Sequence, residues 1–245
     1  MKRFAFFIIL LTASILEAQN PPGDAILKKV DENRFSENKI VVSRMIIHGR
    51  RGSRTVEAKS WQRKMDEAFT EYLAPPREKG IKMLKLGDQL WMYSPSTDRT
   101  IMISGHMLRQ SVMGSDLSYE DMMEDPLMQN VYTAEVTGEE AINGRMCWIL
   151  NLTAKKHDVA YHSRKVWVDK ERYIMLKENR YAKSGRLLKT TEIHEVMQEG
   201  GRWVAKSALF KDVLKEGKGT EFLIDSIEFN ADMPDYIFSK ASLRR

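Results

Sequence analysis

Apolar and polar residues alternate with a period of two along most of the chain, which is the pattern of β-strands whose two faces differ. Short turns such as Gly87-Asp88 and Asn143-Gly144 separate neighbouring runs and indicate hairpins. The clearest runs are 40–48, 81–86, 89–93, 99–103, 132–137, 146–152, 165–168, 173–181, 187–197, 203–212 and 220–229, and the more polar runs are 53–63 and 64–72. We expect a mainly β chain with about eleven strands and two or three short helices.

Two segments depart from this alternation. Residues 25–30 are apolar at helical spacing after Asp24, which is a suitable N-cap. Between residues 104 and 130 the strand pattern stops, and Ser118 with Asp121 resembles a capping pair for one or two helical turns. A short helix is therefore predicted at each place.

The first eighteen residues have the pattern of a secretory signal peptide. Lys2 and Arg3 are basic, residues 4–11 are apolar, and Ala18 closes a suitable cleavage site. The apolar run is much shorter than the roughly 20 residues needed to span a bilayer. We therefore expect an exported, soluble protein that is cleaved near Ala18. No linker or repeat divides the remainder, so residues 19–245 are predicted to form one domain.

Composition and charge exclude several classes of protein. Of the 245 residues, 42% are apolar and 30% are charged, which is typical of a folded chain rather than a disordered one. The net charge of +5 is mild, and the cluster Arg50, Arg51 and Arg54 is more typical of a solvated loop than of a nucleic-acid surface. The single cysteine, Cys147, excludes an internal disulfide and is expected to be an inert, packed thiol.

The sequence lacks the common catalytic motifs. It contains no Gly-x-Ser-x-Gly elbow and no HExxH zinc motif. His157 and His162 are close in sequence but are expected in a polar loop, and the methionines do not follow the Met-x-Met spacing that would favour Cu(I). We therefore predict a protein that is not an enzyme and that carries no metal or other cofactor.

Three blocks of sequence point to a family. Residues 85–95 read KLGDQLWMYSP, residues 114–121 read GSDLSYED, and residues 233–238 read MPDYIF. With these blocks the chain resembles the LolA-like outer-membrane lipoprotein-sorting proteins, over nearly all of its length after the signal segment. The resemblance implies an incomplete (half) antiparallel β-barrel of about eleven strands. Short helices would cover its open side, and its apolar interior would shelter acyl chains.

The methionine content fits such an interior, because methionine is unbranched and polarizable and adapts to flexible apolar ligands. Seven of the 15 methionines lie between residues 92 and 128, and several tryptophans lie on predicted strands. The candidate residues for the cavity and its cover are Met45, Ile47, Trp91, Tyr93, Met102, Met107, Met113, Met122, Met123, Trp148, Leu150 and Trp167. An ordinary core is the alternative for each of them, and the sequence does not show which face of a strand lines the cavity.

The segment 105–128 is predicted to be a mobile loop-plus-helix cover over the open side of the curved sheet. Gly105 and Gly114 provide flexible points, and Pro126 marks its end. A static loop that protects a sheet edge explains the same residues equally well. In LolA a strand arginine holds the helical lid by hydrogen bonding, and the resemblance suggests Arg44 for this role, although an ordinary exposed arginine is the alternative.

The resemblance implies a monomeric periplasmic carrier that moves acylated lipoproteins or other lipids toward the outer membrane. Its partners would be this cargo, an inner-membrane transporter and an outer-membrane acceptor, with no nucleic acid. The alternative is an RseB-like sensor, or an accessory module of an envelope membrane transporter. RseB-like sensors carry a second C-terminal domain, and the chain ends soon after the block at 233–238, which favours the carrier.

Overall fold

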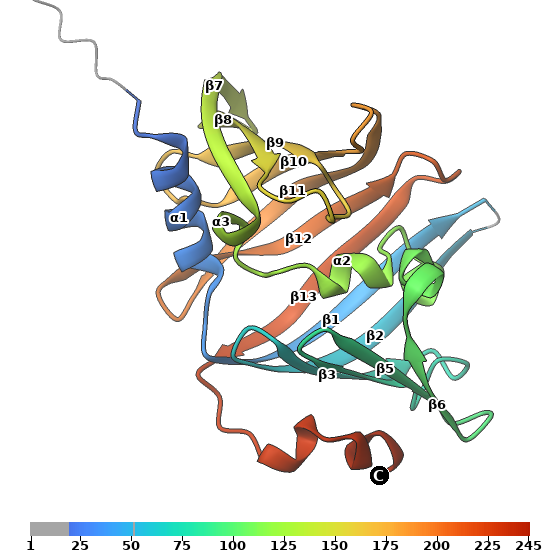
Figure 1. Ribbon diagram of the computed structural model, residues 1–245. Coiled ribbons are helices and arrows are strands. Elements are labelled where there is room, and N and C mark those ends of the chain that lie inside the picture. Colours follow the sequence, from blue (N-terminus) through green and yellow to red (C-terminus); the bar gives the residue numbers. More distant parts are fainter. Residues whose placement is uncertain (1–19, 51) are drawn as a thin grey trace, which may run out of the picture.

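The computed structural model describes residues 20–50 and 52–245, so the predicted signal segment lies outside the described residues. The strands join in one antiparallel sheet (Figure 1). They are β1 (Asn38–Gly49), β2 (Gly52–Arg63), β3 (Glu67–Ala74), β4 (Lys82–Leu86), β5 (Gln89–Ser94), β6 (Arg99–Ile103), β7 (Tyr132–Ile142), β8 (Arg145–Ala154), β9 (Ser163–Asp169), β10 (Met175–Tyr181), β11 (Leu187–Glu199), β12 (Arg202–Asp212) and β13 (Gly219–Phe229). The mainly β prediction is confirmed. The sheet has 13 strands rather than about eleven, because every alternating run, including the polar ones, pairs as a strand of its own.

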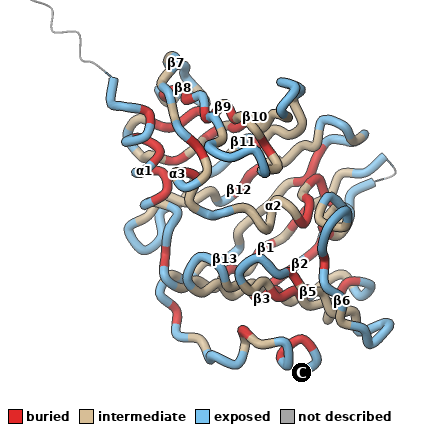
Figure 2. Tube along the Cα trace, viewed as in Figure 1, coloured by how far each residue is buried: buried red, intermediate tan, exposed pale blue. Residues whose placement is uncertain are grey.

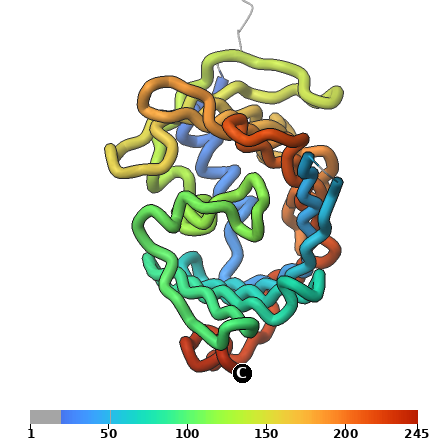
Figure 3. The backbone as a smooth tube through the Cα atoms, turned by 90° about the vertical axis from the view of Figure 1, so that its right-hand side faces the viewer, coloured from blue at the N-terminus to red at the C-terminus, as the bar shows by residue number. Residues whose placement is uncertain are grey.

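The order of the strands shows two meanders that continue into each other. The order is β6-β5-β4-β3-β2-β1-β13-β12-β11-β10-β9-β8-β7, so β1 and β13 pair although they lie far apart in sequence. Strands β6 and β7 are the two edges, and the described strands do not close into a barrel. This open sheet agrees with the predicted incomplete barrel. It curves strongly, which gives the molecule a concave and a convex face (Figures 1 and 3).

The helices are short and lie on different faces of this sheet. They are α1 (Gly23–Arg34), α2 (Tyr119–Met123) and α3 (Met128–Val131), with 3-10 helices η1 (Gly105–Arg109), η2 (Val112–Gly114), η3 (Asp235–Phe238) and η4 (Lys240–Arg244). Figures 1 and 3 show α1, α2 and α3 inside the curve of the sheet, whereas η3 and η4 lie outside it near β3 and β5. The sheet is therefore covered by separate pieces of chain on its two faces.

Helix α1 docks closely on β7. The Cβ of any side chain at position 23 would lie 2.3 Å from the Ala134 carbonyl oxygen, so this close approach requires Gly23. Asp24 accepts a hydrogen bond from the Ala134 backbone N–H at 2.7 Å. The prediction that Asp24 caps the helix is wrong, because Pro22 holds the N-cap position without a side-chain hydrogen bond. Asp24 instead fixes the helix to the sheet edge.

Apolar side chains are buried on both faces of the sheet. On the concave face, α1 packs Ile26, Leu27 and Val30 against β8 and β9. On the convex face, Phe238 of η3 and Leu243 of η4 pack against apolar residues of β3 and β4. Figure 2 shows buried stretches in α1 and along many of the strands. Full burial of one such side chain contributes roughly 1.5–3 kcal/mol, so both covers stabilise the sheet.

Candidate functional site

The concave face of β1–β6 carries a continuous apolar surface. Side chains alternate between the two faces of a strand, so every second residue points to this side. Met45 of β1 lies opposite Val56 of β2, and Met83 of β4 lies opposite Met92 of β5. The buried strand residues of this surface are Met45, Val56, Ala58, Tyr72, Met83, Leu90 and Ile103.

Residues 105–123 lie across this surface, inside the curve of the sheet (Figures 1 and 3). We call them the covering segment; it contains η1, η2 and α2. Its side chains in the apolar cluster are Met107, Leu108, Val112, Met113, Leu117, Tyr119, Met122 and Met123. Gly105 and Gly114 adopt left-handed backbone conformations with φ of 55° and 72°, which glycine allows at little cost. The segment thus packs as a cover; that it moves stays a prediction.

A capping box starts α2, as the sequence predicted. The Ser118 hydroxyl accepts a hydrogen bond from the Asp121 backbone N–H at 3.3 Å, and the Asp121 carboxylate accepts one from the Ser118 backbone N–H at 2.7 Å. An isolated helix of five residues would not be stable in water, so these bonds and its tertiary contacts must hold it. They fix the direction in which Met122 and Met123 meet the sheet.

Polar contacts fasten the covering segment to the apolar half of the sheet. Arg54 of β2 donates to the Met113 carbonyl oxygen and forms an ion pair with Glu78. Lys85 of β4 donates to the Met122 carbonyl oxygen at 3.3 Å. A depression of about 480 Å³ opens beside Arg54, between the segment and the turn after β3. The segment is therefore attached mainly through its backbone on this side. Of its side chains in the apolar cluster, Tyr119 donates to the Met92 Sδ at 3.6 Å, and the others contribute non-directional contacts.

Asp116 attaches the covering segment to the centre of the sheet. Its backbone N–H donates to the Thr220 hydroxyl at 3.0 Å, and this hydroxyl donates back to its carboxylate at 2.8 Å. The other carboxylate oxygen accepts from the Asp212 backbone N–H at 3.0 Å. Asp116 is buried, and a buried carboxylate needs such partners to offset its desolvation. These bonds attach the segment to the end of β12 and the start of β13.

Buried charges face α2 from the other half of the sheet. The charged cluster, as we call it, consists of Arg164, Glu178, Arg180 and Lys189 on this half, together with Asp121 of α2, Glu124 just after it and the hydroxyl of Tyr161. One oxygen of the Asp121 carboxylate accepts from the Tyr161 hydroxyl at 2.6 Å and from Arg180 at 3.1 Å, and the other pairs with Lys189. Asp121, one of the two carboxylates of α2, thus joins strands β10 and β11 to the covering segment.

Glu178 of β10 is the second centre of the charged cluster. Its two oxygens accept from Arg164 at 2.7 Å and from Arg180 at 2.9 Å. Arg164 in turn pairs with Glu124, which follows α2. Glu178 and Arg164 side chains are each 5% exposed, so these ion pairs are shielded from water and salt.

The charged cluster changes the acidity of its members. Burial alone would raise the pKa of Asp121, but Arg180 and Lys189 outweigh it and lower the pKa to about 2. Glu178 behaves in the same way, with its pKa lowered to about 2 by Arg180 and Arg164. For Glu124 burial dominates, and its pKa is raised. At neutral pH, Asp121 and Glu178 are therefore firmly ionised, and α2 is held by ionic contacts on one side and apolar contacts on the other.

The structure brings half of the predicted cavity residues together. Those in the cluster beneath the covering segment are Met45, Ile47, Met107, Met113, Met122 and Met123. Trp148 and Leu150 also lie on the concave face, but they belong to the cluster that α1 covers. The sequence reasoning missed Leu90 and Met92, which share the concave face of β5.

The remaining predicted residues lie elsewhere. Trp91 and Tyr93 pack with the C-terminal segment on the convex face, and Met102, opposite Trp91 on β6, is 43% exposed. Trp167 packs with Cys147 in a further cluster. Both faces of these strands are apolar because both are covered, so alternation alone gave no signal to choose between them.

Arg44 does not contact the covering segment. It forms a two-pronged ion pair with Asp225 of β13, at 2.8 Å from its Nε and 2.7 Å from its Nη2. The contact that the resemblance suggested for Arg44 is made by Arg54, which donates to the backbone of Met113. Arg54 was grouped with loop charges because it lies close to the turn between β1 and β2, and nothing in its sequence context indicated a buried partner.

The described residues offer little for redox, metal or membrane-spanning roles. Burial raises the pKa of the Cys147 thiol to about 11, so it is protonated at neutral pH. Within residues 20–50 and 52–245, no group of three or more His, Cys, Asp or Glu side chains is placed to hold a metal ion. None of the helices in that part of the chain is long and apolar enough to cross a membrane.

Comparisons with known proteins place this geometry in a family. A family model described as "Uncharacterized protein" matches residues 64–245. A comparison with curated proteins finds no match.

Several solved structures share the fold. A putative outer membrane lipoprotein-sorting protein domain from Vibrio parahaemolyticus is 24% identical with a TM-score of 0.79, covering 91% of this chain and 98% of its own. A DUF1329 family protein from Desulfovibrio piger is 24% identical with a TM-score of 0.83, covering 90% and 97%. A LolA superfamily protein from Nitrosomonas europaea is 24% identical with a TM-score of 0.73, covering 91% and 100%. The chain therefore belongs to the family that the matching model describes, and its fold is that of the LolA-like outer-membrane lipoprotein-sorting proteins, as its three sequence blocks predicted.

Proposed function

We propose that the protein is a non-enzymatic periplasmic carrier that binds the acyl chains of lipoproteins or other lipids and transfers them toward the outer membrane. The acyl chains would lie on the concave face of β1–β6, beneath the covering segment. The observation that carries the proposal is the composition of this cover: a methionine-rich segment built of very short helices and the turns between them, packed on a continuous apolar surface.

The chemistry of the covering segment suits exchange with a lipid. An acyl chain gains roughly 0.8 kcal/mol for each CH₂ group that it buries, so a long chain can replace the contacts of several methionines. Met107, Met113, Met122 and Met123 are only partly buried and can turn away through flexible side chains. The bonds of Asp116 and of Asp121 would keep the segment attached while its methionine side chains turn aside. Binding would then be reversible, as transfer requires.

The proposed transfer toward the outer membrane determines which partners the protein would need. Cargo would come from an inner-membrane transporter and pass to an outer-membrane acceptor, and the carrier would act as a monomer. The names of two of the similar structures, a lipoprotein-sorting domain and a LolA superfamily protein, support this route. Acylated lipoproteins and free lipids present the same acyl chains, so the proposal covers both.

The proposal is tested by measuring acyl-chain binding to the parent protein and to a variant of its covering segment. Native mass spectrometry of protein from a periplasmic extract should show a lipid or lipoprotein adduct, and the purified protein should take up a fluorescent fatty acid. Replacing Met122 and Met123 with Glu should weaken this uptake at least tenfold, because carboxylates cannot be buried against an acyl chain. The matched control is Met102→Glu with Met146→Glu, since these methionines are 43% and 51% exposed and lie outside the apolar cluster.

The outcomes of these measurements distinguish a segment that covers bound acyl chains from one that belongs to the structural core. Circular dichroism should show that both double variants keep the β-sheet, since the covering segment is not part of it. If the Met122 and Met123 variant unfolds, the segment is structural core. If that variant takes up fatty acid as well as the control does, or if the parent protein shows no adduct and no uptake, the carrier proposal fails.

A further inference from the structure

Helix α1 leads into β1 at one end of the curved sheet (Figure 1). Three cations come from this connection and from the start of β12. Arg34 ends α1, Lys39 stands at the start of β1, and Arg202 begins β12. Lys39 lies opposite Phe229 of β13, and the Arg202 guanidinium lies 5.5 Å from the centre of the Phe229 ring. Lys39 interacts electrostatically with both arginines. We call Arg34, Lys39 and Arg202 the cation group.

No carboxylate within residues 20–50 and 52–245 forms an ion pair with Lys39, and the charged groups that act on it are Arg34 and Arg202. Asp31 and Glu178 attract Arg34 at longer range. These two carboxylates are already engaged, by backbone N–H groups at the start of α3 and by two arginines of the charged cluster respectively. Among the described residues, the cation group therefore has no carboxylate within ion-pair distance.

The electrostatics of Lys39 reflect the other two cations of the group. Burial, together with repulsion from Arg34 and Arg202, lowers the pKa of Lys39 to about 8. A cation at the end of a helix, such as Arg34, also stabilises the helix dipole. This explanation does not extend to Lys39, which follows the helix and lies on a strand. Binding an anion would relieve the repulsion between these side chains.

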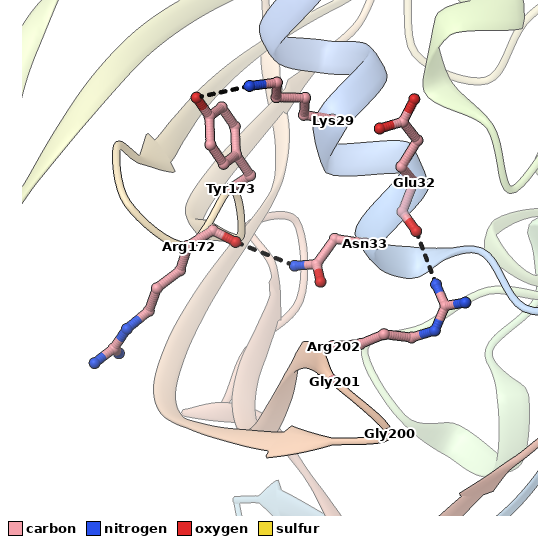
Figure 4. A pocket seen from close by; sticks show the side chains of 8 residues that line it. All are labelled: Lys29, Glu32, Asn33, Arg172, Tyr173, Gly200, Gly201 and Arg202. Carbon is pink, nitrogen blue, oxygen red and sulfur yellow. Dashed lines mark hydrogen bonds between the residues drawn. The ribbon is translucent and has the colours of Figure 1, made fainter.

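Two neighbouring features also indicate a ligand. Ser36, between Arg34 and Lys39 in sequence, is 8% exposed, and its hydroxyl has no hydrogen-bond partner among the described residues. Buried hydroxyls without partners are uncommon in folded proteins. Arg202 also lines an open depression of about 520 Å³ with Lys29, Arg172 and the carboxylate Glu32, shown in Figure 4. This volume is within the range of small-molecule sites. Lys29 contacts Tyr173 and Arg172 lies over the Trp203 ring, so of the cations of this lining it is Arg202 that belongs to the cation group.

We propose that the cation group binds the phosphate of an anionic lipid head group, an inference that rests on the proposed carrier function. Arginine and lysine are the usual ligands of phosphate, and guanidinium groups match its geometry. Lys39 and Met45 lie on the same face of β1, six residues apart, which is roughly 20 Å along a strand. A phosphate at Lys39 therefore leaves an acyl chain free to run along β1 to the apolar surface beneath the covering segment.

The test compares ligands with and without the phosphoglycerol head group. Binding of a short-chain phosphatidylglycerol, of the diacylglycerol with equal acyl chains, and of glycerol phosphate is measured by calorimetry on the full-length protein. The double variant Lys39→Met with Arg34→Gln removes two charges of the cation group. The control Lys28→Met with Arg50→Gln removes the same charges from exposed ion pairs, with Glu32 and Glu216 respectively.

The expected result is that phosphatidylglycerol binds the parent protein at least tenfold more tightly than diacylglycerol does. The cation-group variant should lose this preference, while the control keeps it. Equal binding of both lipids by the parent, or a preference that survives in the cation-group variant, overturns the inference while leaving the carrier function standing.

Binding of glycerol phosphate shows whether the site takes a free phosphate ester instead of a lipid head group. It also distinguishes failure of the phosphate site from failure of the carrier function. If neither lipid binds and glycerol phosphate binds only when the cation group is intact, the site takes a free phosphate ester, and both the lipid source and the carrier function fall. If neither the lipids nor glycerol phosphate binds the parent protein, no anion site exists at the cation group.

Discussion

The two halves of the concave face are built from different chemistry. On β1–β6 the face is apolar and is covered by the methionine-rich covering segment. On β9–β11 the same face presents Arg164, Glu178, Arg180 and Lys189, while α1 covers the apolar residues beyond them on β8 and β9. The short helix α2 touches both halves, with methionines on one side and Asp121 on the other. One short helix can therefore be positioned firmly on its charged side and still offer an exchangeable apolar surface on the other.

The physical reason is the directionality of the two kinds of contact. Ion pairs in a buried site require one geometry, and removing one partner leaves the other charge desolvated and unpaired. Apolar contacts are non-directional, and methionine in particular can repack around a different neighbour. The charged half is therefore expected to set where α2 lies, and the apolar half to determine what can be bound beneath it.

Removing a carboxylate from the charged cluster should have the largest effect on the stability of the protein. Glu178→Leu leaves Arg164 and Arg180 without their shared carboxylate in a site where both are buried. We expect the free energy of unfolding to fall by about 3–5 kcal/mol, measured by urea denaturation. Glu195→Leu is the control, since Glu195 pairs with Lys206 on the surface at 59% exposure, and it should leave the stability unchanged. Equal effects of the two substitutions would contradict the assigned role of the charged cluster.

Acid should reduce the stability that the charged cluster contributes to the folded protein. The pKa values of Asp121 and Glu178 in the folded protein are about 2, below their ordinary values of 3.8 and 4.5. Their stabilisation is therefore present above about pH 5 and is lost as the pH falls toward 2, at roughly 2–3 kcal/mol for each group. Glu124, whose pKa is raised, opposes this trend in part.

Substitution of one carboxylate isolates its share of the acid effect. Asp121→Asn should lower the stability at pH 7 and flatten the loss between pH 5 and pH 2, as measured by denaturation at a series of pH values. A substitution at Asp232, an exposed carboxylate outside the charged cluster, should leave the slope unchanged. If Asp121→Asn leaves the slope as steep as in the parent, Asp121 does not titrate as the structure requires.

The two halves of the concave face differ in how much of their structure the sequence could predict. The alternation of β1, the capping box at Ser118 and the order of the hairpins follow from local patterns, and all three were predicted. The covering segment was also recognised, because a run of methionines and glycines breaks the strand period. Local patterns were sufficient wherever a single element determined the result.

The charged half could not be predicted from the sequence. Arg164, Glu178 and Arg180 look like ordinary solvated charges on strands, and only the curvature of the sheet brings them to α2. Trp91 was assigned to the cavity because both faces of β5 are apolar, and the C-terminal segment that covers it lies about 150 residues away in sequence. Pairings over such distances are tertiary information that the period of a strand does not contain.

The smallest predicted effect separates Arg44, in the middle of β1, from Arg54, near the start of β2. Arg44→Gln breaks a surface ion pair with Asp225 and should leave hydrogen exchange in residues 105–123 unchanged. Arg54→Gln removes a bond to the Met113 carbonyl oxygen and leaves the buried Glu78 without its ion-pair partner, so exchange near Met113 should become severalfold faster. If Arg44→Gln accelerates exchange as much as Arg54→Gln does, the cover is held by the whole β1–β2 hairpin rather than by Arg54, and the contact with Met113 is incidental.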